Sequence, residues 1–166
     1  MNNIILSSNF YQDIDSIHDL IKSMEFDANL YGSEILDFNF IPNELQELFN
    51  TKLNESVEVL LGTFRKPNSL IHFENFYQHS LWKCIVAIED TNLKILEQDN
   101  IKSFFDVEDV DSFILENGND ESKWNCKHSL TLKKNDFIFI RPWMWHKLEE
   151  DKLIQVFLLN QDLYKA

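Results

Sequence analysis

The fold class follows most directly from the segment LKKNDFIFIRPWMWH, which runs from Leu132 to His146. It opens with a turn signal at Asn135-Asp136, and four residues that alternate Phe and Ile follow as a strongly apolar strand. A loop containing Pro142 comes next and ends at a histidine. The stretch therefore predicts a turn, a buried strand and a loop that presents His146 at the end of a β-scaffold.

The remainder of residues 56–166 shows short β-rich runs separated by turn residues. We expect strands near Val57–Phe64, Leu70–Phe76, Trp82–Glu89, Leu93–Glu97, Cys126–Leu132, Phe137–Ile140 and Leu153–Leu159. About seven or eight strands favour a mainly β fold, an antiparallel sandwich or barrel. Between residues 98 and 125 the periodicity lapses and acidic residues accumulate. This composition indicates a solvated loop, and a lid over a binding site is the alternative interpretation.

Two helices are expected in residues 1–55, the helical N-terminal part of a single domain that spans residues 1–166. Apolar residues recur at helical spacing between Tyr11 and Met24. A second helix is indicated after Pro42, with Leu45 and Phe49 on one face. Neither helix carries an obvious chemical group.

Composition narrows the classes of protein. A hydrophobic content of 44% with 13% aromatic residues excludes a disordered chain. The formal net charge of -13 repels phosphate backbones, so we expect no nucleic-acid partner. No signal-peptide pattern and no long apolar run occur, so we expect a cytoplasmic protein with no membrane partner. Cys84 and Cys126 make no disulfide framework and are expected to be reduced thiols in the core.

The tripeptide His72-Phe73-Glu74 is the first candidate for chemistry. In a strand, positions i and i+2 point to the same face, so the imidazole and the carboxylate project together. With His146 they would occupy one face of an octahedral metal ion and leave three positions open for a bidentate cosubstrate and dioxygen. The alternative interpretation is an ordinary polar face of an edge strand and a loop histidine packed among Trp143, Met144 and Trp145.

Residues 132–147 resemble the distal motif of the cupin-like JmjC oxygenases. Asn135-Asp136 corresponds to the Gly-Asp turn of that motif, Arg141-Pro142 to its Pro-Pro pair, Trp145-His146 to its Trp-His end and His72-Phe73-Glu74 to the upstream H-x-[DE]. The resemblance covers about residues 70–159. It implies a double-stranded β-helix, also called a cupin or jelly roll, and a catalytic Fe(II) held by His72, Glu74 and His146.

Two positions depart from that family pattern. Asn135 stands where the family has Gly, which is tolerable because Asn accepts a left-handed turn. Trp143 stands where the family has a second Gly, and its bulky ring would narrow the mouth of the metal site.

The resemblance also implies 2-oxoglutarate as cosubstrate, which needs a cation for its far carboxylate. Lys83 matches the lysine that the family uses, and Arg65 and Arg141 are the alternative cations. Both faces of the strand at residues 82–88 are apolar, so we expect both to be covered. A lysine there needs an anionic partner or a wet cavity. The alternative is a lysine at the solvent end of the strand.

These observations lead us to expect a non-haem Fe(II)- and 2-oxoglutarate-dependent oxygenase that oxidises an unidentified small-molecule or peptide substrate. The four-ligand site of germin-type cupins is absent, because Glu74 stands in place of the second histidine. Two other functions stay open. One is a cupin-like metal-binding or small-molecule-binding protein, or a metal-dependent isomerase that uses His72, Glu74 and His146, without 2-oxoglutarate chemistry. The other is a metal-free β-sandwich that acts in protein interaction. A homo-oligomer is compatible with the sequence.

Overall fold

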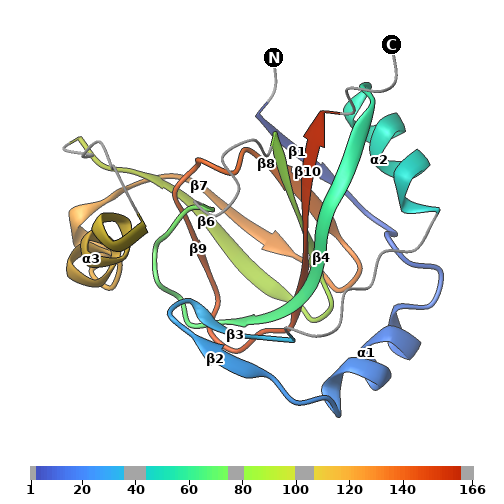
Figure 1. Cartoon of the computed structure of the whole chain (residues 1–166), viewed down its shortest axis with the longest axis horizontal. Coiled ribbons are helices and arrows are strands. Elements are labelled where there is room, and N and C mark those ends of the chain that lie inside the picture. Colours follow the sequence, from blue (N-terminus) through green and yellow to red (C-terminus); the bar gives the residue numbers. More distant parts are fainter. Residues whose placement is uncertain (1–2, 36–43, 75–80, 100–106, 162–166) are drawn as a thin grey trace.

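The computed structural model describes residues 3–35, 44–74, 81–99 and 107–161, and most of its elements are strands (Figure 1). The strands are β1 (Ile4–Ser7), β2 (Asp27–Asn29), β3 (Gly32–Glu34), β4 (Val57–Pro67), β5 (Trp82–Ala87), β6 (Thr91–Glu97), β7 (Asn125–Leu132), β8 (Phe137–Ile140), β9 (His146–Leu148) and β10 (Ile154–Gln161). The helices are α1 (Ile14–Lys22), α2 (Leu45–Leu53) and α3 (Val107–Asn117), with a 3-10 helix η1 at Glu121–Lys123. The expected mainly β fold is confirmed. None of the described helices is long and apolar enough to cross a membrane.

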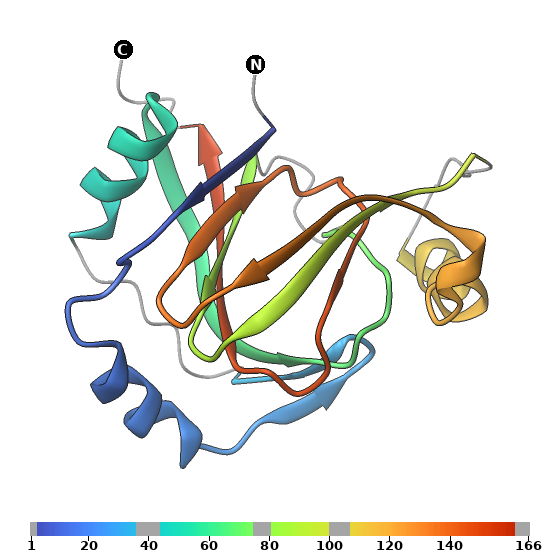
Figure 2. The same ribbon diagram turned by 180° about the vertical axis from the view of Figure 1, so that it is seen from behind.

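The strands form two antiparallel sheets. The larger sheet has seven strands in the order β1-β8-β5-β10-β4-β3-β2, and the smaller has three in the order β7-β6-β9. Seen from behind, the smaller sheet crosses in front of the larger one (Figure 2). Strand β10 lies between β4 and β5 and pairs antiparallel with both. Neighbours in each sheet are mostly distant in the sequence, so side chains from separate segments meet between the sheets.

An apolar core fills the space between the two sheets. Its buried side chains come from β5, β8 and β10 of the larger sheet and from β6, β7 and β9 of the smaller one. On β5, Ile85 and Ala87 point into this core, whereas Trp82, Cys84 and Val86 point to the outer face. Both faces of β5 are buried, which confirms the expectation for this strand.

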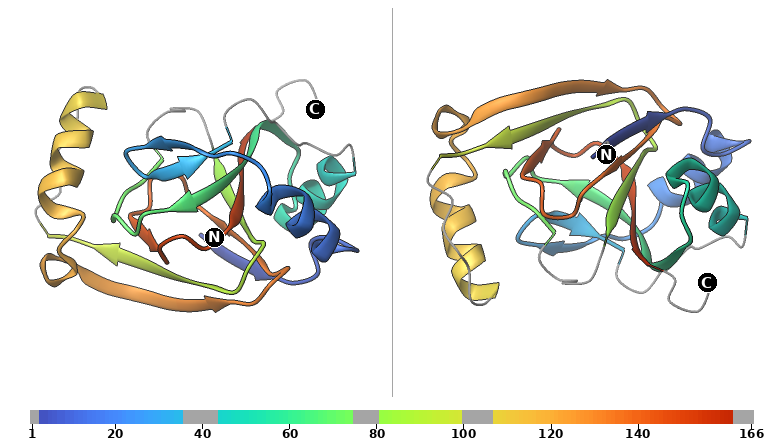
Figure 3. Two further views of the ribbon diagram at one scale, coloured as in Figure 1. Left: turned by 90° about the horizontal axis from the view of Figure 1, so that it is seen from below. Right: turned by 90° about the horizontal axis from the view of Figure 1, so that it is seen from above.

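Helices α1 and α2 cover the outer face of the larger sheet, where Ile21 and Phe49 are fully buried. Helix α1 begins after Asp13, whose carboxylate accepts a hydrogen bond from the backbone N–H of Ser16. Helix α2 ends at Asn54 in the left-handed conformation, a common helix C-terminus. The two expected N-terminal helices are therefore confirmed. Helix α3 lies at the opposite end of the molecule (Figure 3).

The prediction of a strand over residues 70–76 is wrong for the part that the structure describes. Within it only His72 makes a β-bridge, with His146. The backbone N–H of Glu74 donates instead to the carbonyl of Pro142, in the loop before β9, at 2.9 Å. The segment is held by loops and makes no regular ladder with a neighbouring strand. Residues 75 and 76 lie outside the described part of the chain.

The prediction of a solvated loop over residues 98–125 is also corrected, because α3 and η1 lie there. On α3, Val110, Phe113 and Ile114 are buried at helical spacing and pack in one cluster with Trp124 and Trp145. Acidic residues at the intervening positions hid this spacing in the sequence. Residues 100–106 lie outside the described part.

Two expectations about single residues have different outcomes. Asn135 has a φ of 76°, the left-handed turn that was expected of it. Its side chain also exchanges two hydrogen bonds with the backbone of Tyr11, at 2.8 and 2.7 Å. Cys84 is buried, but Cys126 is exposed, so the assignment of both thiols to the core is wrong for Cys126.

Candidate functional site

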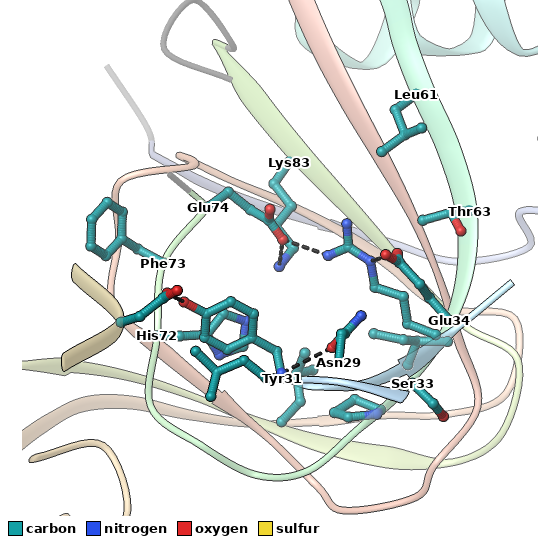
Figure 4. A pocket seen from close by; sticks show the side chains of 16 residues that line it. Asn29, Tyr31, Ser33, Glu34, Leu61, Thr63, His72, Phe73, Glu74 and Lys83 are labelled. Atoms are coloured by element: carbon teal, nitrogen blue, oxygen red, sulfur yellow. Dashed lines mark hydrogen bonds and ion pairs between the residues drawn. The ribbon is translucent and has the colours of Figure 1, made fainter. Parts of the chain in front are cut away.

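A cavity of about 460 Å³ opens at one end of the space between the sheets (Figure 4). Its wall includes four of the residues predicted for the site: Arg65 on β4, Lys83 on β5, and His72 and Glu74 in the segment between these strands. The fifth, His146 at the start of β9, is fully buried and contacts both His72 and Lys83. The fold therefore brings these five side chains together.

A two-way backbone contact sets the two histidines side by side. The N–H of His72 donates to the carbonyl of His146 at 3.0 Å, and the N–H of His146 donates to the carbonyl of His72 at 2.9 Å. Directly opposed residues of such an antiparallel bridge project their side chains to the same side. The ring centroids of His72 and His146 accordingly lie 4.6 Å apart.

Both imidazoles are fixed in the same tautomer. The Nδ1 atom of His72 lies 2.8 Å from the carbonyl oxygen of Leu70, and Nδ1 of His146 lies 2.9 Å from that of Met144. A carbonyl oxygen only accepts, so Nδ1 carries the hydrogen in each ring and Nε2 keeps its lone pair. Burial, helped by the Lys83 charge, lowers the pKa of His72 to about 4 and that of His146 well below its ordinary value. Both rings are therefore neutral at pH 7.

Glu74 supplies a carboxylate to the same cavity. Its Oε1 accepts hydrogen bonds from Lys83 Nζ at 2.8 Å and from Arg65 Nη1 at 2.5 Å. Burial alone would raise the pKa of this carboxyl, but the Arg65 and Lys83 charges outweigh burial and hold it well below its usual range. The charge of Arg65 is also balanced by Glu34, whose Oε2 lies 3.3 Å from Nε of Arg65. This contact is an ion pair that lacks hydrogen-bond geometry. Glu74 is therefore ionised.

Lys83 is a fully buried lysine on the inner face of β5. Its neighbours across the sheet are Leu158 on β10 and Ile140 on β8, both apolar. The ammonium lies 2.8 Å from Glu74 Oε1 and 2.8 Å from His146 Nε2. Burial lowers its pKa to about 8, against the opposing pull of the Glu74 charge. The expected anionic partner is thus present, and the alternative of a lysine at the solvent end of the strand is wrong.

The donor groups suit a divalent metal, but their present positions do not. Two neutral imidazoles with unprotonated Nε2 atoms and one ionised carboxylate form the donor set that non-haem iron prefers. Among the described residues, however, no three His, Cys, Asp or Glu side chains are arranged to hold a metal ion. The Lys83 ammonium lies between Glu74 and His146. A metal bound by both would require Lys83 to move.

Arg141, the third candidate cation, does not line the cavity. Its guanidinium carbon lies 3.6 Å from the ring centroid of Trp82, and its Nη1 donates to the carbonyl of Leu81 at 3.0 Å. Trp143 follows in the same loop and is 58% exposed. The ring expected to narrow the metal mouth therefore projects into solvent and is not part of the cavity wall.

Tyr31 and Asp111 also line the cavity, and no sequence motif predicted either of them as a site residue. The ring of Tyr31, in the turn between β2 and β3, stacks on His72 with centroids 4.7 Å apart. Its hydroxyl donates to Asp111 Oδ1 on α3 at 2.8 Å, across 80 positions of sequence (Figure 4). Asp111 is one of the many acidic residues between positions 98 and 125. No local signal could have paired them.

By sequence, the chain matches no family model and no curated protein. Comparison with solved structures does find matches. HygX from Streptomyces hygroscopicus, with nickel and 2-oxoglutarate bound, superposes with a TM-score of 0.58 at 8% identity over 98% of this chain and 84% of its own. The non-haem alpha-ketoglutarate-dependent epimerase SnoN from nogalamycin biosynthesis gives a TM-score of 0.60 at 8% identity over 96% and 79%. AviO1 from Streptomyces viridochromogenes gives 0.51 at 7% identity over 99% and 92%. The fold is like theirs. At such low identity, the likeness concerns the fold alone.

The two buried histidines predict a pH dependence of stability. Because the folded pKa of His72 is about 4 against an ordinary 6.5, the unfolded chain binds more protons between these values, and stability falls as pH is lowered. From pH 7 to pH 5, His72 alone should lower the free energy of unfolding by about 2 kcal/mol, and His146 acts in the same direction. Urea unfolding in the presence of a chelator measures this change.

His72→Gln should make the pH dependence shallower, and His128→Gln, at an exposed position on β7, serves as its matched control. A wild-type stability that is flat from pH 7 to pH 5 would contradict the neutral, buried state of these rings.

Proposed function

We propose that this protein is a non-haem Fe(II)- and 2-oxoglutarate-dependent oxygenase with a double-stranded β-helix core. In this proposal His72, Glu74 and His146 hold the metal, and the substrate is an unidentified small molecule or peptide. The observation that carries it is the convergence of two neutral imidazoles with unprotonated Nε2 atoms, one ionised carboxylate and two cations at one cavity. The donor set has the composition of the two-histidine, one-carboxylate iron sites of oxygenases.

The bound metal and its cosubstrate would supply the oxidation chemistry, and the chain supplies geometry and charge. The carbonyls of Leu70 and Met144 hold the two imidazoles in the tautomer that can bind a metal. Arg65 keeps Glu74 ionised, and Lys83 or Arg65 would pair with the far carboxylate of 2-oxoglutarate.

The solved structures support the same type of chemistry. HygX has been seen with nickel and 2-oxoglutarate, and also with iron. SnoK and SnoN, from nogalamycin biosynthesis, are described as non-haem alpha-ketoglutarate-dependent enzymes. SnoK is described as a carbocyclase and SnoN as an epimerase, so enzymes that catalyse different reactions share one fold. The likeness supports the cofactors of the proposal and leaves its substrate open.

The contact of Lys83 with Glu74 and His146 favours a second candidate, a cupin-like binding protein without 2-oxoglutarate chemistry. In that case the ammonium would balance Glu74 permanently, and the cavity would bind a small molecule without a metal. The two candidates differ in what they bind, so one binding measurement separates them.

The deciding experiment is calorimetric titration of the full chain with 2-oxoglutarate, anaerobically, after loading with Mn(II) as a redox-stable substitute for iron. We expect about one equivalent to bind. Glutarate, which lacks the 2-keto group, should bind more weakly, because it cannot form the same chelate. Absence of binding at millimolar 2-oxoglutarate would contradict the proposal and favour the binding protein.

A further inference from the structure

The position of the Lys83 ammonium has a consequence for metal binding. It lies 2.8 Å from both Glu74 Oε1 and His146 Nε2, two atoms that the proposed function assigns as metal ligands. Nε2 of a neutral imidazole has a single lone pair, and here that lone pair accepts a hydrogen bond from the ammonium. The same lone pair cannot coordinate a metal at the same time.

Distances lead to the same conclusion. Metal ions bind histidine nitrogen and carboxylate oxygen at roughly 2.0–2.2 Å. The one lone pair of His146 Nε2 is directed at the Lys83 nitrogen 2.8 Å away, so an ion bound along it would lie between these two atoms, and both the ion and the ammonium carry positive charge. Metal and ammonium therefore exclude each other at this point.

The surroundings of Lys83 determine what displacement would do. Its stem is fixed among apolar neighbours such as Leu158 and Ile140, so only the end of the side chain can move, and the cavity lies beside it. Within the described residues, Lys83 makes a single ion pair, and its partner is Glu74. The other carboxylates in the cavity wall already have partners, since Glu34 pairs with Arg65 and Asp111 accepts a hydrogen bond from Tyr31. A displaced ammonium would lose its own ion pair, and a buried cation without a counter-charge attracts an anion strongly.

We propose that Lys83 and a divalent metal compete for Glu74 and His146, and that metal binding releases the ammonium to receive an anionic cosubstrate. The inference rests on the proposed function for the identity of the metal and the cosubstrate. Metal binding then precedes cosubstrate binding, because the site for the cosubstrate carboxylate forms only when the metal has displaced the Lys83 ammonium. Lys83 thus has two alternating partners, Glu74 before metal entry and the cosubstrate after it.

Replacing Lys83 by an apolar residue of similar length tests the competition. In Lys83→Met the metal no longer has to break two charge-assisted hydrogen bonds, so Mn(II) should bind about ten- to a hundred-fold more tightly than in the wild type. Calorimetric titration of the chelator-stripped full chain measures the affinity. The control is Lys94→Met on β6, which removes the same charge at a lysine paired with Glu121. It should leave the affinity unchanged.

The outcomes separate this inference from the proposed function. Equal Mn(II) affinity in the wild type and Lys83→Met would overturn the competition and leave the metal enzyme intact. Binding by Lys83→Met alone would support the competition and overturn the metal enzyme, because Lys83 would then be a permanent substitute for the ion. Absence of binding by both would overturn both.

A measurement on the wild type covers the case in which Lys83→Met does not fold. A buried, hydrogen-bonded ammonium gives a protected ¹⁵N NMR signal, distinct from those of exposed lysines. One equivalent of diamagnetic Zn(II) should shift or broaden this signal, because the ammonium loses its partners. A signal that stays unchanged at saturation would overturn the competition.

Discussion

The chain with His146→Ala is expected to lose its divalent metal while it remains folded. His146 provides one of the two Nε2 lone pairs, and substitution of residues that merely orient such ligands already weakens metal binding by about 10–100-fold. Loss of the ligand itself should therefore exceed about a hundredfold. The same result is expected for His72→Ala, since its ring faces that of His146 at 4.6 Å between centroids. Elemental analysis after Mn(II) loading and gel filtration measures the metal retained.

His128→Ala is the matched control for both variants, because His128 is an exposed histidine on β7 in the smaller sheet. Circular dichroism verifies that each variant is folded. Equal metal content in the wild type, His72→Ala and His146→Ala would contradict the assignment of these histidines as metal ligands. Loss of metal from His128→Ala alone would point to a surface site instead.

Lys83→Ala should weaken 2-oxoglutarate binding by about ten- to a hundred-fold. A charge-assisted contact between an ammonium and a carboxylate contributes roughly 1.5–3 kcal/mol, which corresponds to that factor. The titration is performed at saturating Mn(II), so that metal occupancy is the same in both proteins. Lys94→Ala, which removes an equal charge outside the cavity, should bind 2-oxoglutarate like the wild type.

The alternative results for Lys83→Ala are equally informative. If the variant binds 2-oxoglutarate as tightly as the wild type, Lys83 is not the cosubstrate cation, and Arg65→Met becomes the next variant. Arg65 lines the same cavity and contacts Glu74 at 2.5 Å. Arg141 is a weaker candidate, because its guanidinium lies against Trp82 and outside the cavity wall.

Local sequence patterns determined several features of this protein correctly. The turn at Asn135, the strand after it and the two N-terminal helices follow from spacings of a few residues, and the structure confirms them. The apolar residues on both faces of β5 likewise predicted that both faces are buried. They also predicted that Lys83 needs an anionic partner. Such features are predictable because the side-chain period of a strand or a helix depends on neighbouring residues alone.

Local patterns were misleading where tertiary contacts replace regular pairing. The segment around His72 resembled a strand, yet its backbone bonds go to His146 and to the loop at Pro142. The acidic stretch resembled a loop, yet α3 packs three buried side chains against the tryptophans Trp124 and Trp145. In both cases the deciding partners are remote in the sequence, so no window of neighbouring residues contains them.

The donor groups of the site were identifiable from sequence motifs, whereas their relative positions follow from the tertiary structure. The motifs named His72, Glu74, His146 and Lys83 as a set, since imidazole, carboxylate and ammonium groups occur there in a family-like order. The Lys83 ammonium lies between Glu74 and His146 only because the smaller sheet, which carries His146, and the segment at Glu74 pack against β5. The contacts of Tyr31 with His72 and Asp111 arose in the same way. The physical reason is that these distances depend on long-range strand pairing and helix packing, which leave no trace in local spacing.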